Sequence, residues 1–107
     1  MYFENNEIMK EKLAQVYNRL AYSDEGSMCW KLNPQLISCD AETLRAVSAF
    51  KTCDWMRNPQ KFVHGGLVGA MFDTVMGYLA IAATDCFATP TITMETSYLR
   101  PVPINDT

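Results

Sequence analysis

The sequence is poor in the residues that build metal centres. It has one histidine, His64, and its four cysteines include no Cys-x-x-Cys pair. Structural zinc sites take their ligands from closely spaced pairs of this kind. We therefore expect no metal and no other cofactor.

A secretory leader is also missing from the first residues, which carry neither a basic stretch nor an apolar one. Disulfides are rare in proteins that stay in a reducing compartment. We therefore expect a cytoplasmic protein with four reduced, partly buried thiols, and a disulfide framework is the minor alternative.

Positive charge is scarce as well. Nine Lys and Arg residues stand against twelve Asp and Glu residues, which gives a net charge of −3. A surface that follows nucleic-acid phosphates needs a basic patch, so we expect no nucleic-acid partner. The length of 107 residues, with 49% hydrophobic and 20% charged residues, is typical of one globular domain over residues 1–107.

The chain has only one long apolar stretch, residues 67–88, and Asp73 interrupts it. A carboxylate near the middle of a bilayer costs at least ~2.5 kcal/mol. The stretch is therefore interpreted as a core helix, and we expect no membrane partner. Because it is apolar on nearly all sides, we also expect it to be enclosed on most sides.

Periodicity predicts the other elements. Residues 6–22 carry apolar residues at three- and four-residue steps, which is typical of a helix, and Asn5 or Asn6 is suited to cap it. Residues 35–39 and 43–52 are interpreted as two strands of a hairpin, because the second segment alternates, and a loop is expected over 53–63. The core helix is expected over 67–83, and alternation predicts a further strand over 91–99. The predicted class is therefore α+β with one buried helix.

The most informative segment opens the core helix. His64-Gly65-Gly66 would leave backbone N–H groups unobstructed at a helix start, where anions and oxyanions bind. Asp73 follows Gly66 by seven residues, about two turns, and lies near the same face. Such donors and a carboxylate suit acyl transfer. The alternative interpretation is that His64 caps the helix and Asp73 bonds a nearby hydroxyl.

These residues carry a resemblance. Asn58-Pro59, His64-Gly65-Gly66, Asp73-Thr-Val-Met-Gly77 and the run from Thr91 through Tyr98 to Pro101 are together similar to hotdog-fold acyl-CoA thioesterases. The similarity is to the PaaI-like (phenylacetate-pathway) branch of the 4-hydroxybenzoyl-CoA thioesterase superfamily, and it covers about residues 35–103. It implies a curved antiparallel sheet wrapped around a long central helix.

The resemblance also implies an activity, the hydrolysis of an acyl-CoA to the free acid and CoA. Members pair edge to edge, so a homodimer or homotetramer is expected, with the active site at the subunit interface. Gly65 would polarise the thioester carbonyl through its N–H, and Asn58 would hold that carbonyl or the water. Asp73 of the opposite subunit would act as base or nucleophile, Thr91 would orient the water, and His64 would position the loop.

Two further roles follow from the same resemblance. Gly66 would allow close approach of the acyl-CoA, and Arg100 would meet a CoA phosphate. Family members usually continue with more strands after this point, so we expect a sheet that lacks its C-terminal strands. The alternatives are a non-catalytic acyl-CoA-binding or assembly module on the same fold, and a hotdog dehydratase, which the spacing disfavours.

Overall fold

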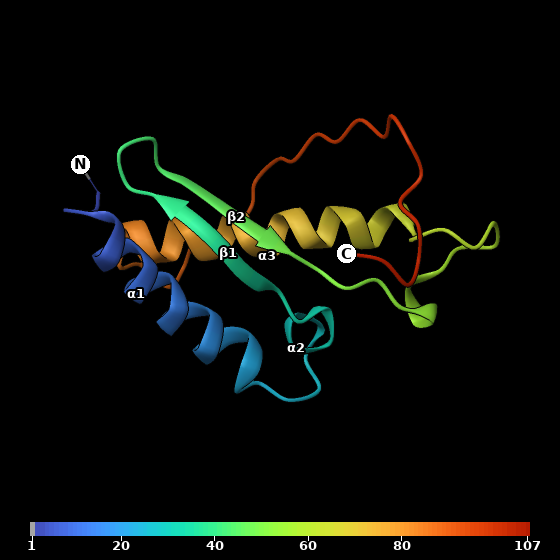
Figure 1. Cartoon of the computed structure of the whole chain (residues 1–107), viewed down its shortest axis with the longest axis horizontal. Coiled ribbons are helices and arrows are strands. Elements are labelled where there is room, and N and C mark those ends of the chain that lie inside the picture. Colours follow the sequence, from blue (N-terminus) through green and yellow to red (C-terminus); the bar gives the residue numbers. More distant parts are fainter. Residues whose placement is uncertain (1) are drawn as a thin grey trace.

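The computed structural model describes residues 2–107 (Figure 1). Three helices, two strands and two short helical turns follow one another along the chain. In order they are α1 (Asn6–Tyr17), a π-helical turn (Asn18–Tyr22), α2 (Met28–Leu32), β1 (Gln35–Asp40), β2 (Arg45–Ala49), a 3-10 turn (Asp54–Met56) and α3 (Gly65–Thr84).

The predicted N-terminal helix is confirmed, and its last five residues form the π-helical turn. Asn5 is its cap, because its side-chain oxygen accepts a hydrogen bond from the Ile8 N–H at 2.9 Å. The short helix α2 was not predicted. It begins where the Ser27 hydroxyl accepts from the Trp30 N–H at 3.1 Å, and it ends at Asn33 in the left-handed conformation.

The predicted hairpin is also confirmed. Strands β1 and β2 pair antiparallel, with an irregularity in register between Leu36 and Ser38. Ala46 and Ser48 of β2 are half-buried, whereas Arg45 and Val47 are exposed. The buried face meets α1, where the Tyr17 hydroxyl and the Ser48 hydroxyl lie 2.5 Å apart.

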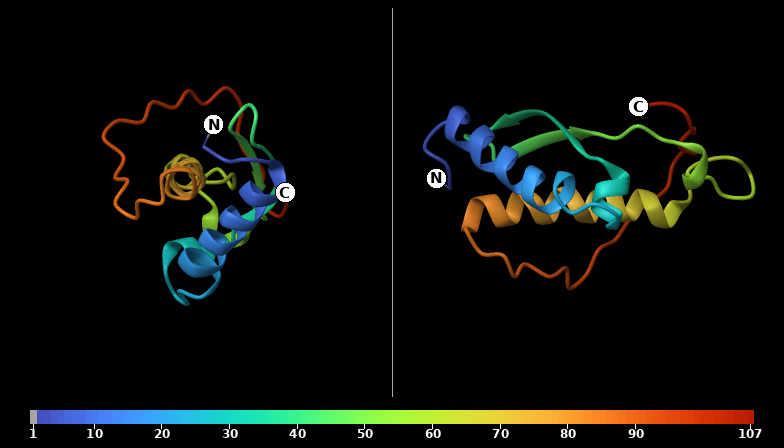
Figure 2. Two further views of the ribbon diagram at one scale, coloured as in Figure 1. Left: turned by 90° about the vertical axis from the view of Figure 1, so that its left-hand side faces the viewer. Right: turned by 90° about the horizontal axis from the view of Figure 1, so that it is seen from below.

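Helix α1 and the hairpin cover one side of α3 (Figures 1 and 2). The rings of Tyr17 on α1 and Tyr78 on α3 meet edge to face, with centroids 5.0 Å apart. Two buried clusters result, one towards each end of α3. The first contains Phe3, Met9, Leu13, Tyr17, Ala21, Ala41, Tyr78 and Ala82, and the second contains Leu32, Met56, Val63 and Met71.

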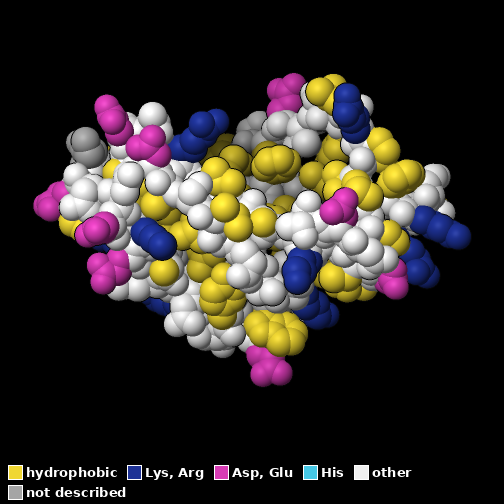
Figure 3. Space-filling model, viewed as in Figure 1, with side chains coloured by type: hydrophobic (Ala, Val, Ile, Leu, Met, Phe, Trp, Pro, Cys, Tyr) yellow, Lys and Arg dark blue, Asp and Glu magenta, His cyan; other side chains and the backbone are white. Residues whose placement is uncertain are grey.

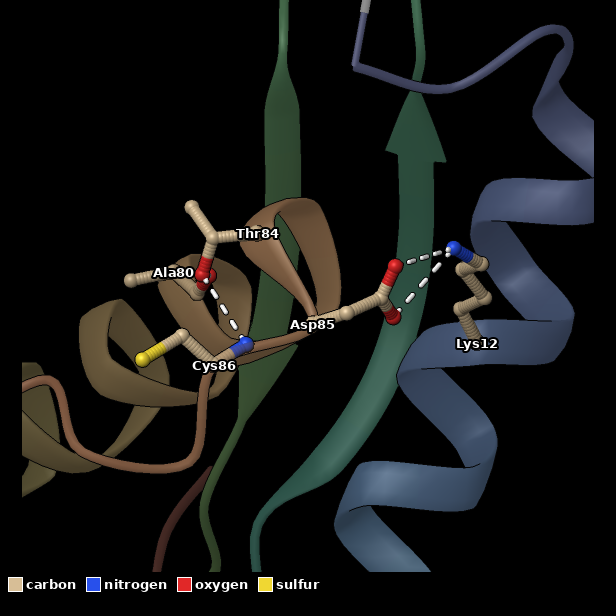
Figure 4. Close-up of polar contacts among 5 residues, drawn as sticks. All are labelled: Lys12, Ala80, Thr84, Asp85 and Cys86. Carbon is tan, nitrogen blue, oxygen red and sulfur yellow. Dashed lines mark hydrogen bonds and ion pairs between the residues drawn. The ribbon is translucent and has the colours of Figure 1, made fainter.

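The C-terminal end of α3 is fixed by polar contacts (Figure 4). Asp85 caps the helix in the left-handed conformation, and its carboxylate pairs with the Lys12 ammonium of α1 at 3.2 Å. The Thr84 hydroxyl donates to the Ala80 carbonyl at 2.7 Å and accepts from the Cys86 N–H at 3.3 Å. These contacts end the helix where the chain turns away.

The expectation that α3 is enclosed on most sides was wrong. Phe72 and Met76 are 52% and 50% exposed, because a two-stranded sheet is too narrow to wrap around a helix. Apolar side chains are visible across the middle of the face shown in Figure 3. By length and composition α3 could also cross a membrane, a test that core helices of soluble proteins pass as well.

The predicted strand over 91–99 was wrong as well. This segment belongs to no strand, because a strand needs a neighbour that pairs with its backbone and the hairpin lies on the other side of α3 (Figure 2). The chain pairs with other backbone again from Val102 onward. The Val102 carbonyl accepts from the Val63 N–H at 2.8 Å, Pro103 bridges to Phe62, and Thr52 exchanges backbone hydrogen bonds with Asn105 and Asp106, each at 2.8 Å.

The architecture is thus α+β, with a two-stranded antiparallel sheet against a long helix. It is consistent with a hotdog fold whose sheet is incomplete. For the site, the important result is that α3 carries Gly65, Gly66 and Asp73, and that the segment after it runs back along its side away from the hairpin (Figure 2).

Candidate active site

The start of α3 is capped by His64. Its Nδ1 accepts from the Gly66 N–H at 2.9 Å, and its own backbone N–H donates to the Met56 carbonyl at 2.7 Å. The interpretation of His64 as a helix cap is therefore confirmed. The Gly66 N–H is engaged in this cap, whereas the Gly65 N–H has no hydrogen-bond acceptor among residues 2–107. The helix start thus offers Gly65, and not both glycines, to an oxyanion.

Asn58 organises the loop in front of this helix start. Its side-chain oxygen accepts from the backbone N–H groups of Gln60 and Phe62, each at 3.0 Å. Its backbone N–H donates to the Phe62 carbonyl at 2.7 Å. Within residues 2–107 the side-chain NH₂ group of Asn58 has no acceptor. That group remains able to donate to a ligand.

Three of the predicted residues, Asn58, Gly65 and Arg100, line one open pocket of about 400 Å³ at the start of α3. Val68 and Tyr98 also line this pocket. The structure therefore brings a backbone donor, an amide and a guanidinium together from three separate parts of the chain. We call this hollow the helix-start pocket.

Tyr98 is a site residue that the sequence reasoning missed. Its hydroxyl donates to the Gly65 carbonyl at 2.6 Å, and its ring lies 3.4 Å from where a Cβ on Gly65 would be. One turn further on, Gly69 would place a Cβ 3.5 Å from the Met94 methyl. Side chains of the segment after α3 therefore pack over both glycines. The signals in the sequence were the two glycines at helical spacing and the Tyr-x-x-Pro pattern.

A second group forms further along α3. The Thr91 hydroxyl donates a hydrogen bond to the Asp73 carboxylate, and both side chains are exposed. They line a second open pocket, of about 530 Å³, which we call the Asp73 pocket. Its remaining walls include Cys29 of α2, Gly77 of α3 and Phe87 of the following segment. The expectation that Asp73 bonds a nearby hydroxyl is confirmed.

One wall of the Asp73 pocket contains a buried phenol. Tyr78 is 4% exposed, and its hydroxyl has no hydrogen-bond partner among residues 2–107. Burial raises the pKa of Tyr78 above its ordinary value, and the neighbouring Cys29 thiol raises it further. The Cys29 sulfur lies 3.9 Å from the Thr74 hydroxyl. The wall is therefore neutral.

The two pockets are too far apart to act on one bond within a single chain. Asp73 follows Gly65 by eight residues, which is about 12 Å along a helix axis. Reacting atoms must approach to about 3–3.5 Å. The structure thus assembles Asn58, Gly65 and Arg100 in one place and Asp73 and Thr91 in another.

No group of metal-ligating side chains occurs in the described part of the chain, residues 2–107. The four cysteines are free thiols, and Cys86 is exposed where partial burial was expected. The candidate chemistry therefore rests on a carboxylate, a hydroxyl, an amide and a backbone N–H.

Comparison with known proteins bears on the C-terminal part of the chain. Residues 60–107 match the family model described as the Thioesterase superfamily. No curated protein and no solved structure matched the chain. The matched range contains Gly65, Asp73, Thr91 and Arg100, while Asn58, α1 and the hairpin lie outside it. The match supports the thioesterase superfamily that the sequence motifs indicated.

Proposed function

We propose that the protein is a cytoplasmic hydrolase that cleaves acyl-CoA thioesters to the free acid and CoA, as in the PaaI-like branch. The observation that carries the proposal is the hydrogen bond from Thr91 to Asp73, within the range that matches the thioesterase superfamily. It pairs a hydroxyl of the segment after α3 with an exposed carboxylate on α3, and the start of that helix presents a free backbone donor.

The chemistry follows from this pair. The Thr91 hydroxyl uses its hydrogen on one oxygen of Asp73, so its lone pairs and the second carboxylate oxygen are open to a water molecule. Asp73 takes a proton from that water as the new C–O bond forms. The C–S bond then breaks, and the CoA thiolate receives the proton. One thioester and one water thus give one acid and one thiol.

The oxyanion that forms in this step needs donors near the carbonyl. Gly65 N–H and the Asn58 amide supply them in the helix-start pocket. Because Asp73 of the same chain lies about 12 Å away along the axis, we propose that Asp73 of the partner subunit acts there as the base. The functional unit is then a homodimer, or a homotetramer of such dimers, with two sites across its interface.

The same pocket suits the CoA moiety. Arg100 lines it and carries the positive charge that a CoA phosphate requires. Gly66 has no side chain to obstruct the helix start, and its N–H is bonded to His64. We propose that CoA lies over this helix start and that Arg100 contacts one of its phosphates.

The direct test is hydrolysis of a panel of alkyl- and aryl-acyl-CoAs by the wild type and by Asp73→Asn. Loss of a general base is expected to lower kcat by about 100-fold or more. Asp24→Asn, which changes an exposed carboxylate in a turn away from both pockets, is the matched control. Equal background rates for the wild type and Asp73→Asn would overturn the proposal.

A non-catalytic acyl-CoA-binding module is the second candidate, and the separation of the two pockets in one chain favours it. Calorimetry with CoA and with acyl-CoAs distinguishes the two functions. Binding without turnover by the wild type, with Arg100→Gln weakening binding, would support the module.

A further inference from the structure

The Asp73 pocket contains a hollow that no side chain fills, and it lies over Gly77. A Cβ placed on Gly77 would meet nothing within 4 Å. Gly77 follows Asp73 by four residues, so the two lie on the same face of α3, one turn apart. The empty space therefore begins directly beside the carboxylate.

Glycine is a costly choice at this position. In the interior of a helix it is about 1 kcal/mol less favourable than alanine. At Gly65 and Gly69 a Cβ would lie in van der Waals contact with Tyr98 and Met94, whereas at Gly77 it would have no neighbour within 4 Å. What Gly77 provides is open volume in the pocket.

Away from the Asp73 carboxylate, this hollow has apolar side chains in its lining. Ile81 lies one turn beyond Gly77, Tyr78 is the neighbouring residue of α3, and Phe87 lines the hollow from the segment after the helix. Phe87 is held from behind, because the Arg19 guanidinium lies over its ring at 5.3 Å from the centroid. An apolar group entering beside Asp73 would thus meet the apolar side chains of Ile81 and Phe87.

We propose that Gly77 determines the acyl specificity of the site: the hollow over it receives the apolar part of an acyl group longer than acetyl. This inference rests on the proposed function, since it places the thioester carbonyl next to Asp73. The acyl group then extends from Asp73 across Gly77 towards Ile81, which lies about 12 Å from Asp73 along the axis. The CoA moiety extends away from this pocket.

The test fills the hollow without disturbing the helix. Gly77→Leu adds a side chain that fits the open space and is a better helix former than glycine. Gly77→Ala is the intermediate variant. Ile37→Leu is the matched control, because it changes an exposed aliphatic residue of β1 that lines neither pocket. The substrates are straight-chain acyl-CoAs from acetyl to decanoyl.

Gly77→Leu is expected to lower kcat/KM for the longer acyl-CoAs by about tenfold or more, the scale at which pockets discriminate methylenes. Its kcat/KM for acetyl-CoA should stay at the wild-type value, Gly77→Ala should fall between, and Ile37→Leu should match the wild type throughout. If Gly77→Leu changes all chain lengths equally, or none, the inference is overturned while the proposed function stands.

A wild type that hydrolyses none of these substrates overturns the proposed function, and a binding measurement then decides the inference. Calorimetry with the non-hydrolysable S-ethyl-CoA and S-decyl-CoA thioethers is the readout. Weaker binding of S-decyl-CoA alone by Gly77→Leu supports the hollow as an acyl site. Equal affinities of the wild type and Gly77→Leu for S-decyl-CoA overturn it.

Discussion

The hydroxyl of Tyr98 donates a 2.6 Å hydrogen bond to the carbonyl of Gly65, the first residue of α3. This contact joins the segment after α3 to the helix start, although 33 residues separate the two in sequence. It also sets the position of Arg100, two residues further on, at the rim of the helix-start pocket.

Tyr98→Phe removes that hydrogen bond and keeps the ring. Because Tyr98 is 55% exposed, unfolding should become easier by no more than about 1 kcal/mol. KM for acyl-CoA should rise several-fold while kcat changes little, since the contact positions the binding segment and leaves Asp73 untouched. Tyr2→Phe, at another exposed tyrosine, is the control. A fall in kcat at unchanged KM would contradict this role.

Thr91 gives a second prediction. Thr91→Val keeps the shape of the side chain but removes the donor to Asp73, and kcat should fall by about tenfold or more. Thr91→Ser restores a hydroxyl and should recover most of the activity. Thr93→Val, at an exposed threonine two residues away, should behave as the wild type. Failure of Thr91→Ser to rescue would show that the methyl group, and not the hydroxyl, matters.

Tyr17 and Tyr78 form a matched pair for stability. Tyr17→Phe breaks the bond to Ser48 and should lower the free energy of unfolding by about 1 kcal/mol. Tyr78→Phe removes a buried hydroxyl that has no partner among residues 2–107, so stability should stay equal or rise by about 1 kcal/mol. Urea unfolding of both variants measures the contrast, and equal losses would contradict it.

Alkaline pH should destabilise the fold. Burial raises the pKa of both Tyr17 and Tyr78, so above pH about 10 the unfolded chain loses these protons while the folded chain keeps them. The stability that is present below pH 10 therefore declines as pH rises. Each phenol contributes a slope of about 1.4 kcal/mol per pH unit. Tyr78→Phe should show a shallower decline, and an identical one would refute the assignment.

The exposed apolar face of α3 gives a prediction about association. Phe72 and Met76 are each about half exposed, and apolar surface of this kind is commonly covered by a partner. The double variant Phe72→Gln, Met76→Gln should shift sedimentation towards the monomer. Its unfolding free energy, measured at low concentration, should change little. A wild type that is monomeric at every concentration would contradict the dimer proposed above.

Local signals in the sequence were enough to predict α1, the hairpin and α3. Asn5 caps α1, alternation defines β2, and the long apolar run defines α3 within two residues at its start. Each of these elements is specified by residues close together in the chain. Helix α2 was missed because five residues are too few to show a period.

The errors concern interactions between distant residues. Residues 91–99 alternate as a strand does, but pairing depends on a neighbouring edge that the pattern itself cannot reveal. The exposure of Phe72 likewise depends on what packs beside α3. In the site, the spacing of seven residues between Gly66 and Asp73 predicted that both lie near the same face of the core helix. It could not show that Thr91 bonds Asp73, or that Tyr98 bonds Gly65.

The extended segment over 91–99 has a consequence for the handling of the protein. A protease binds its substrate as an extended strand with free backbone groups, and this segment presents that shape on the surface, with Ile92 and Leu99 almost fully exposed. The first cut by chymotrypsin should therefore fall at Tyr98 or Leu99. That cut would separate Arg100 from α3 while Asp73 and Thr91 stay on one fragment.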